Sequence, residues 1–547
     1  MTTVPDEDRS RTRSLVTSRA GVIASESVLA SQVGARILEG GGTAVDAAVA
    51  ANAVLGLVAP MNDGIGGDLF AIIHEASTDR LHGLNASGWA PSALSAEYLR
   101  SQGLSEMPQQ GIHSVTVPGA VAGWQCLLQR FGCRSLAELL APAIHYAEQG
   151  FAIEEVVQSY WQASEAVLRA DAAAAHTYLP HGRVPRVGEL FRNPELAWSY
   201  RQIASAGSEA FYRGAVAHRI LATSAARGGR LQAEDLADYQ PEWIEPISID
   251  YRGWRICELP PNGQGIAALE MLNILERSPL ATWGHNSART LHTMIEAKKL
   301  SYADLMRYVG DLRFAKVPVA TLISKPFAAA RAHSIDPHRA TDRVAPGILP
   351  GTDHGTTYLA VADRAGNMVS LIQSNFAAVG FGAGLAVEGA GFVLQNRGGL
   401  FTLAAGHPNA LAGRKRPLHT IIPGFMSKDG MRIAFGIMGG WNQAQAHAQF
   451  VANVVDFGLN IQAALDAPRF SKDTFEGLDV NLEARIPEAV RRQLRDLGHQ
   501  ILLRGDYSSV RMGSGQAVAW DPAQRLFLGA SDARKDGAAI AALEPWT

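Results

Sequence analysis

The chain is poor in cysteine, in net charge and in long apolar runs, and each shortage excludes a class of protein. Its 547 residues hold only three cysteines, Cys126, Cys133 and Cys257, which are too few for a disulfide scaffold and form no C-x-x-C ligand pair. We therefore expect buried apolar thiols.

The charges of the chain are nearly balanced. Lys and Arg total 49 against 52 for Asp and Glu, a net charge of −3. That balance predicts no nucleic-acid partner and no binding to an anionic membrane.

Apolar residues do not form a run long enough to cross a membrane. The longest stretch, Thr43 to Ala59, contains Asp46 and Asn52, and it falls short of the roughly 20 residues that span a bilayer. We interpret it as a buried helix. The first residues carry charges but lack the apolar segment and cleavage site of a secretory signal. The sequence therefore predicts a cytoplasmic protein.

Hydrophobic periodicity predicts a mixture of helices and antiparallel strands. Helical spacing dominates residues 115–310 and recurs at 28–57, 443–457 and 487–497. Strand patterns occupy residues 68–73, 357–362, 368–373, 433–437, 517–520 and 526–528. Between Asp336 and Gly355, six prolines and glycines predict an exposed irregular segment. These patterns together favour an α+β fold.

Several common enzyme signatures are absent from the sequence. It contains no G-x-S-x-G nucleophile elbow, no H-E-x-x-H zinc helix and no G-x-x-x-x-G-K-[ST] phosphate loop. The glycine clusters at 64–67 and 380–384 lack the rest of a nucleotide-binding motif, so we interpret both as tight turns. We expect neither a cofactor nor a metal.

Thr356 is the candidate nucleophile. It opens a predicted strand directly after the Pro/Gly-rich segment, in HGTTYLAVADRAGNMVSLIQSN, residues 354–375. If the chain cleaves itself between Gly355 and Thr356, this residue supplies both a hydroxyl nucleophile and the α-amine that activates it. A free α-amine has a pKa of about 7.7 to 8, which suits proton transfer near neutral pH. A purely structural role for threonines of high β propensity is the alternative.

Gly439 and Gly440 are candidates for an oxyanion hole. They follow one predicted strand and precede a predicted helix, so their successive backbone N–H groups could converge on a developing negative charge. A plain turn between strand and helix is the alternative interpretation.

Motifs along nearly the whole chain carry a family resemblance. They are GGTAVDAAVA (41–50), GIGGDLF (64–70), VPGAVAGW (117–124), LLAPAIHYAEQGF (139–151), EAFYRG (209–214), TTYLAVADRAGN (356–367), KRPLHTIIP (415–423), IMGG (437–440) and GASDARKDG (529–537). Their order and spacing resemble the γ-glutamyltranspeptidase family of N-terminal-nucleophile hydrolases.

The resemblance implies a four-layer αββα sandwich that is made as a proenzyme. Cleavage before Thr356 would give a large chain, residues 1–355, and a small chain, residues 356–547, which together form one folded unit. Two such units could then dimerise. The resemblance also implies that Thr356 is the nucleophile and that Gly439 and Gly440 form the oxyanion hole. Ser374 takes the place of a family hydroxyl that assists maturation and catalysis.

The substrate-binding positions depart from the family pattern. Ser87 stands where true γ-glutamyl enzymes have an arginine for the substrate α-carboxylate. His419 and Thr420 replace two serines that bind the same carboxylate, and Leu400 replaces the acidic residue that binds the substrate amine. Removing one charged hydrogen bond costs about 1.5 to 3 kcal/mol, so losing both anchors predicts a loss of about 10²-fold or more in γ-glutamyl turnover. Glutathione is therefore not the expected substrate.

Arg397 and His419 suggest a pocket for an anion instead. The planar guanidinium of Arg397 suits a small carboxylate, and QNRGG with KRPLHTIIPGF is similar to the divergent branch of the family that includes the oxamate amidohydrolase type. We expect a small amide acid as substrate, in contact with Arg397, His419, Thr420 and Asn375. A structural role for Arg397 is the alternative.

Three points stay open on the sequence. One extra residue between Ser374 and Glu388 leaves open whether Asn375 or Phe376 replaces the amine-binding asparagine of the family. A glutathione hydrolase or transpeptidase with a rebuilt pocket is the alternative enzyme. A catalytically silent binding subunit is the alternative from another class, although no structural need explains why Thr356 and Ser374 are retained together.

Overall fold

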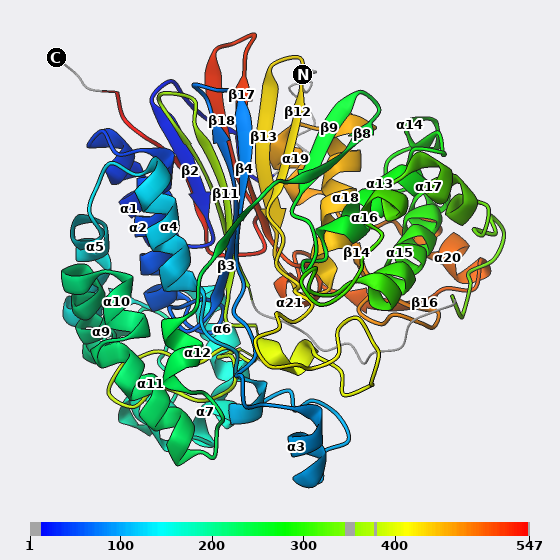
Figure 1. The fold of residues 1–547 in the computed structure, drawn as a ribbon. Helices are drawn as coiled ribbons and strands as arrows, with labels where there is room; N and C mark the ends of the chain where they lie inside the picture. The colour runs from blue at the N-terminus through cyan, green and yellow to red at the C-terminus, as the bar shows by residue number, and fades with distance from the viewer. Residues whose placement is uncertain (1–11, 345–355, 377–379, 545–547) are drawn as a thin grey trace.

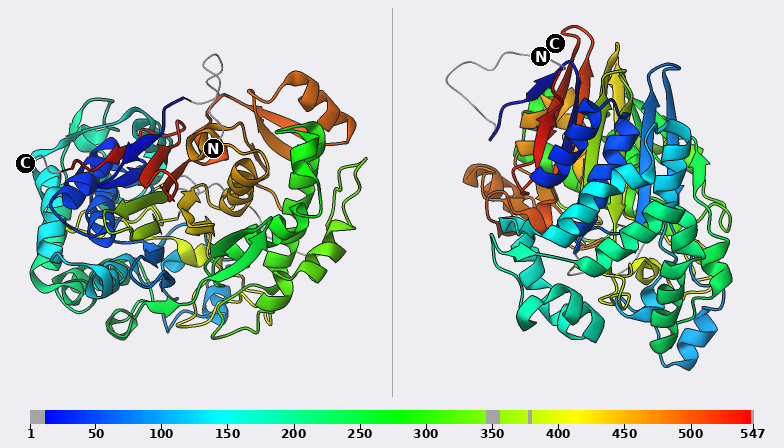
Figure 2. Two further views of the ribbon diagram at one scale, coloured as in Figure 1. Left: turned by 90° about the horizontal axis from the view of Figure 1, so that it is seen from above. Right: turned by 90° about the vertical axis from the view of Figure 1, so that its left-hand side faces the viewer.

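Two β-sheets lie face to face, and helices cover the outer side of each. The structure is a computed structural model that describes residues 12–344, 356–376 and 380–544. One helical layer lies on the left of Figure 1 and the other on the right, with both sheets between them. Seen from above, the two helical layers again lie on opposite sides of the paired sheets (Figure 2). This architecture confirms the α+β class and the four-layer αββα sandwich.

The first sheet has seven strands and is antiparallel throughout. In spatial order its strands are β19 (Ala538–Ala541), β2 (Gly21–Ser25), β10 (Thr357–Asp363), β11 (Met368–Ser374), β3 (Asp68–Glu75), β4 (Arg80–Ala86) and β7 (Glu242–Ile244). The hairpin of β10 and β11, with its turn at residues 363–367, confirms the prediction from the sequence. It places the start of β10 beside the end of β11.

The second sheet also has seven antiparallel strands. They are β1 (Val16–Ser18), β18 (Leu526–Ser531), β17 (Gly515–Asp521), β13 (Met431–Ile437), β12 (Gly424–Lys428), β9 (Trp254–Glu258) and β8 (Ile247–Tyr251). Strands β7, β8 and β9 lie inside residues 115–310, where helical spacing was expected to dominate. The sequence did not predict these strands because they are only three to five residues long. An alternating pattern is hard to recognise over so few residues.

Alternating side chains of β10 divide the core into an inner and an outer part. Tyr358 and Ala360 pack between the two sheets, whereas Leu359 and Val361 pack against helices, as the two-residue period of a strand requires. The sheets approach closely here, since a Cβ on Gly436 of β13 would lie 2.4 Å from the ring of Tyr358. Odd and even positions of β10 therefore face different layers.

Helix α2 (Ala44–Val58) confirms the predicted buried helix. Thr43 and Asp46 form a capping box at its start, and all fifteen of its residues are buried. It packs on β10 and β11 of the first sheet and against α1 (Val28–Glu39), α4 (Ala120–Phe131) and α5 (Leu136–Gln149), and α9 (Pro194–Ala206) packs on α5. Across the described residues, the structure has no helix that combines the length and the apolar character of a membrane span.

The second sheet is covered by helices from both halves of the sequence. They are α13 (Gly265–Leu275), α15 (Ala288–Tyr308), α18 (Asn442–Val455) and α19 (Ile461–Asp466). The remaining elements are β5 (Phe151–Ala152), β6 (Leu190–Phe191), β14 (Phe470–Ser471), β15 (Asp479–Glu483), β16 (Gln500–Arg504), α3 (Ala96–Ser101), α6 (Glu155–Ala163), α7 (Glu165–Arg169), α8 (Ala172–Tyr178), α10 (Ser208–Tyr212), α11 (Ala215–Ala226), α12 (Ala233–Ala237), α14 (Leu280–Trp283), α16 (Val319–Leu322), α17 (Lys325–Ala332), α20 (Glu488–Asp496) and α21 (Ser509–Met512), with 3₁₀ turns η1 (Ile112–Ser114), η2 (Pro180–Gly182) and η3 (Arg397–Leu400).

The structure contradicts the prediction for the cysteines and confirms the prediction for the turn at 64–67. The thiols are not uniformly buried: Cys257 is buried, but Cys126 is half-buried and Cys133 is exposed, where its Sγ contacts a carboxylate oxygen of Asp46 at 3.0 Å. The close-packed turn at 64–67 is present, because a Cβ on Gly66 would lie 1.9 Å from the carbonyl oxygen of Val393. That turn places the start of β3 against the end of β11.

Candidate active site

Thr356 lies immediately before β10, and its side chain is buried. It is two residues from Tyr358, so it shares the face of β10 that looks toward the second sheet. Its Oγ1 lies 3.4 Å from the Oγ of Ser374 and 3.4 Å from Nε2 of Gln443, which donates to it. The threonine hydroxyl is thus placed between the two sheets. Gly355 lies outside the described residues, so the scissile bond itself is not described.

Ser374 is the last residue of β11 and sits beside Thr356 through the β-hairpin. Thr357 pairs with Gln373 in the ladder, which leaves the preceding and following residues next to each other. The Oγ of Ser374 accepts a hydrogen bond of 2.8 Å from the backbone N–H of Phe376. The serine oxygen therefore lies between the N–H of Phe376 and the hydroxyl of Thr356.

The hydroxyl of Thr356 has no side-chain base beside it. Among the described residues, its only side-chain partners are the hydroxyl of Ser374 and the amide of Gln443. A hydroxyl has a pKa far above neutral and needs a base to become a nucleophile. The α-amine that cleavage would release from Thr356 could act as this base.

Gly439 and Gly440 form the turn between β13 and α18, as predicted. Both have a positive φ, +120° and +55°, a backbone conformation that favours glycine. The carbonyl of Gly439 accepts from the N–H of Asn442 at 2.9 Å. Within the part of the chain that the structure describes, the N–H groups of Gly439 and Gly440 have no acceptor. Two free N–H groups on one turn suit an oxyanion.

Gln443 was not singled out from the sequence, although it links this turn to the nucleophile. It lies at the start of α18, with its amide nitrogen toward Thr356 and its amide oxygen accepting from the N–H of Ile422 at 3.0 Å. Its position three residues after Gly440, in a helix that begins at the turn, was the available signal.

Arg397 is fully buried in η3 and has two free donors. Its Nη1 donates to Oγ1 of Thr420 at 2.6 Å, and its guanidinium carbon lies 4.2 Å from the ring centroid of Phe376. Among the described residues, its Nε and Nη2 have no hydrogen-bond partner. Burial lowers the pKa of Arg397 to about 9, and the nearby charge of Asp68 opposes that shift. A buried guanidinium with free donors is a site for an anion.

His419 is held in place by Asp68 instead of being free to bind a ligand. Its Nε2 donates to Oδ2 of Asp68 at 3.0 Å, and its Nδ1 accepts from the N–H of Ile421 at 3.3 Å. Burial, together with the charges of Arg397 and Arg416, lowers its pKa well below the usual value. Both ring nitrogens are therefore used, and the imidazole is neutral.

Asp68 is a second functional residue that the sequence did not reveal. It is the ladder partner of Ser374. Its Oδ1 accepts from the N–H groups of Gly88 and Gly119 at 2.9 and 3.1 Å and from Nε2 of Gln395 at 2.8 Å. Burial raises its pKa to about 6, and the charge of Arg397 together with these three hydrogen bonds opposes that shift. Its place in the quoted motif GIGGDLF, an acid opening a buried strand, was the signal.

The side chains of Asn375 and Ser87 form hydrogen bonds with neighbouring groups of the protein. The amide nitrogen of Asn375 donates to the carbonyls of Pro60 and Asp63 at 3.2 and 2.6 Å. Its amide oxygen has no partner among the described residues. The hydroxyl of Ser87 is buried and accepts from the amide of Asn262 at 3.2 Å.

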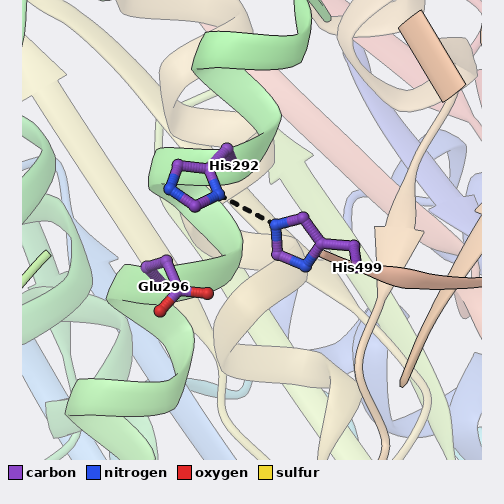
Figure 3. A group of neighbouring side chains, drawn as sticks. All are labelled: His292, Glu296 and His499. Carbon is purple, nitrogen blue, oxygen red and sulfur yellow. Dashed lines mark hydrogen bonds between the residues drawn. The ribbon is translucent and has the colours of Figure 1, made fainter. Parts of the chain in front are cut away.

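A separate cluster of His292, Glu296 and His499 has ligand atoms within 4.8 Å of one another (Figure 3). The two imidazoles share a hydrogen bond of 2.9 Å, and the other nitrogen of His292 donates to the carbonyl of Asp336 at 2.8 Å. Glu296 is paired with the ammonium of Lys299 at 2.7 Å. Because that ammonium already neutralises the only carboxylate of the cluster, these side chains suit the anchoring of the segment at Asp336 better than the binding of a cation.

Comparison with known proteins gives a consistent result. The family described as Gamma-glutamyltranspeptidase matches residues 30–542. The glutathione hydrolase-like YwrD proenzyme of Bacillus subtilis is 36% identical over 526 residues, 95% of this chain and 98% of the relative. The oxamate amidohydrolase proenzyme of Klebsiella pneumoniae is 34% identical over 533 residues, again 95% and 98%. The crystal structure of cephalosporin acylase from Bacillus halodurans covers 100% of this chain and 99% of its own, with a TM-score of 0.91 and 41% identity.

Proposed function

The chain belongs to the gamma-glutamyltranspeptidase family, and from that premise we propose that it cuts itself between Gly355 and Thr356 to become active. It is an amide-bond hydrolase of the N-terminal-nucleophile class. Residues 1–355 would form the large chain and residues 356–547 the small chain of one folded unit. A cytoplasmic location and further dimerisation of the cleaved pair stay predictions.

The proposed reaction uses Thr356 twice. Its α-amine takes the proton of Oγ1 as this oxygen attacks the amide carbonyl, and the N–H groups of Gly439 and Gly440 stabilise the oxyanion. The protonated amine then gives its proton to the leaving nitrogen, which departs as ammonia or an amine. Water, deprotonated by the same α-amine, attacks the ester, and the acid is released as the protonated amine returns the proton to Oγ1. Ser374 and Gln443 hold the threonine oxygen in place.

A small amide acid is the substrate that this site supports best. The observation that carries this proposal is Arg397, a fully buried guanidinium whose Nε and Nη2 have no partner in the described part of the chain. A substrate carboxylate would satisfy both donors in a bidentate pair. Thr420 and Phe376 hold the guanidinium, and His419 supports the site through Asp68 without touching the substrate. Asn375 offers only its amide oxygen.

Glutathione hydrolysis is the second candidate, and the name of the Bacillus subtilis relative favours it. Against it stand Ser87 and Leu400 at the positions that would bind the γ-glutamyl carboxylate and amine. Ser87 is buried and bonded to Asn262, and Leu400 packs in an apolar cluster. Neither residue offers a charge to the substrate.

A substrate panel separates these proposals. The purified, cleaved protein would be given oxamate, glutathione, γ-glutamyl-p-nitroanilide and a cephalosporin side-chain amide, with product release measured for each. We expect turnover of oxamate to exceed that of both γ-glutamyl compounds by about 10²-fold or more, because the γ-glutamyl anchors are missing. Faster release of p-nitroaniline than of ammonia from oxamate would refute the amide-acid proposal and favour glutathione hydrolase.

A further inference from the structure

One buried glutamine connects the two halves of the proposed site. Gln264 lies just before α13, and its side chain is fully buried. Its amide nitrogen donates both to the carbonyl of Thr420 and, at 2.7 Å, to the carbonyl of Gly440. Its backbone N–H also donates to the carbonyl of His419 at 3.0 Å. A single side chain thus joins the two loops that flank the hairpin of β12 and β13.

The two loops carry different parts of the proposed chemistry. Thr420 holds the guanidinium of Arg397 through its Oγ1 at 2.6 Å, and Gly440 belongs to the turn with the free N–H groups. Gln264 therefore bridges the carboxylate site and the oxyanion turn. The hydroxyl of Tyr302, also fully buried, contacts Oε1 of Gln264 at 3.3 Å and donates to the carbonyl of Trp441.

A second chain of contacts runs along the other side of the site. The guanidinium of Arg397 lies on the ring of Phe376 at 4.2 Å, the N–H of Phe376 donates to Ser374 at 2.8 Å, and Ser374 contacts Thr356 at 3.4 Å. Only two residues stand between guanidinium and nucleophile on this path. The guanidinium and Thr356 are therefore linked by a short chain of contacts on this side and through Gln264 on the other.

We propose that Gln264 is a positioning residue that fixes the separation between the carboxylate site and the oxyanion turn. The enzyme then selects amide acids by the number of carbons between the substrate carboxylate and the amide carbonyl. Because only Phe376 and Ser374 separate Arg397 from Thr356, the shortest members of that series are the preferred substrates. This inference rests on the proposed function and adds the determinant of chain length.

Misplacing a reacting group by about 1 Å can lower a rate by about 10²-fold. A rigid separation therefore makes the rate depend steeply on substrate length, whereas a loosened one lets longer and shorter substrates reach both anchors about equally well. Length selectivity is accordingly the property that reports on Gln264. A loss of stability alone would lower all the rates together.

The experiment uses the cleaved protein and the series oxamate, malonamate, succinamate and glutaramate, with ammonia release measured as kcat/KM. The test variant is Gln264→Met, which keeps the length of the side chain and removes its hydrogen bonds. The matched control is Gln449→Met, because Gln449 is also buried and its amide nitrogen donates to two carbonyls, those of Gln445 and Phe470, at 3.2 and 3.1 Å. Within the described parts of the chain, Gln449 has no hydrogen bond to the site residues named above.

In the wild type we expect one of the two shortest substrates to be preferred over glutaramate by about 10²-fold. Gln264→Met should lower this ratio at least about tenfold, and Gln449→Met should leave it unchanged. If Gln264→Met does not yield folded protein, Tyr302→Phe replaces it, since it frees the carbonyl of Trp441 and should lower the same ratio.

Three other results would refute either the role of Gln264 or the proposed function. If the wild type selects by length and Gln264→Met keeps the full ratio, the role of Gln264 is refuted while the proposed function stands. A wild type that prefers glutaramate refutes the short separation in the same way. If the cleaved wild type hydrolyses none of the four amide acids, the proposed function fails, and the inference fails with it.

Discussion

Arg397 is the buried residue on which the proposed substrate class depends. Its Nε and Nη2 are unpartnered among the described residues, and unpaired donors in a buried site favour a ligand that pairs with them. Replacing it by Met removes the charge and keeps much of the volume. We expect kcat/KM for a carboxylate-bearing amide to fall by about 10- to 100-fold, the equivalent of one charged hydrogen bond at about 1.5 to 3 kcal/mol.

Two measurements make the Arg397→Met result specific. The methyl ester of the same amide acid should lose little activity on this substitution, because it has no charge for the guanidinium to bind. The rate of self-cleavage should also be preserved. An equal loss for acid and ester would show that Arg397 supports the structure without binding the carboxylate.

The α-amine of Thr356 sets the expected pH dependence. It acts as a base only when unprotonated, and its pKa as a free amine is about 7.7 to 8. We therefore expect kcat/KM to rise with pH through about 7 to 8 and to level off above. His419 adds no step near pH 6.5, since its pKa is well below the usual value. A rate that is flat from pH 6 to 9 would contradict the amine as base.

At the scale of elements, the site depends on how closely the turn at 64–67 packs on β11. A Cβ on Gly67 would lie 2.5 Å from the carbonyl oxygen of Ser374 and 2.7 Å from Oδ1 of Asn375. We expect Gly67→Ala to displace the end of β11, to slow self-cleavage and to destabilise the fold by about 1 to 3 kcal/mol. Denaturant unfolding and the appearance of the small chain over time measure the two effects.

Gly505→Ala is the matched control for this substitution. Gly505 is exposed and a Cβ there would meet no atom within 4 Å, so cleavage and stability should both stay at wild-type level. Equal behaviour of the two variants would mean that the packing of this turn does not position Ser374.

The whole molecule explains why a cut chain should stay together. Each sheet takes strands from both sides of Thr356: in the first sheet β19 and β10 pair with β2 and β11 pairs with β3, and in the second β12 pairs with β9. The two pieces share both sheets and the core between them. Separating them would expose that core.

We expect the wild type to run as two chains on a denaturing gel and as one species in native size exclusion. Scaling 58.4 kDa by the residues on each side of Thr356 gives about 38 and 20 kDa. Thr356→Ala should remain one chain of 58.4 kDa without activity, because the nucleophile is gone. An intact wild-type chain that turns over substrate would overturn cleavage as the activating step.

Much of this protein could be predicted from its sequence, because the deciding signals were local. Helix α2 followed from one long apolar stretch, and the hairpin of β10 and β11 from two strand patterns joined by a short turn. The ordered motifs predicted the family, the sandwich and the candidate nucleophile Thr356. The short strands β7 to β9 were not predicted because a strand of three to five residues is stabilised mainly by its neighbours. Its own sequence carries only a weak strand pattern.

Sequence by itself determined the fold, the family and the residue types available for chemistry, since each is written in contiguous stretches or in their order. Only the tertiary structure decided which polar groups are already bonded and which are free. His419 and Arg397 were both candidates for binding an anion. Asp68, 351 positions away from His419, uses one imidazole nitrogen, whereas Nε and Nη2 of Arg397 have no partner among the described residues. The bridge from Gln264 to Gly440 spans 176 positions. Such contacts depend on which loops the fold brings together, and no local pattern in the sequence records that.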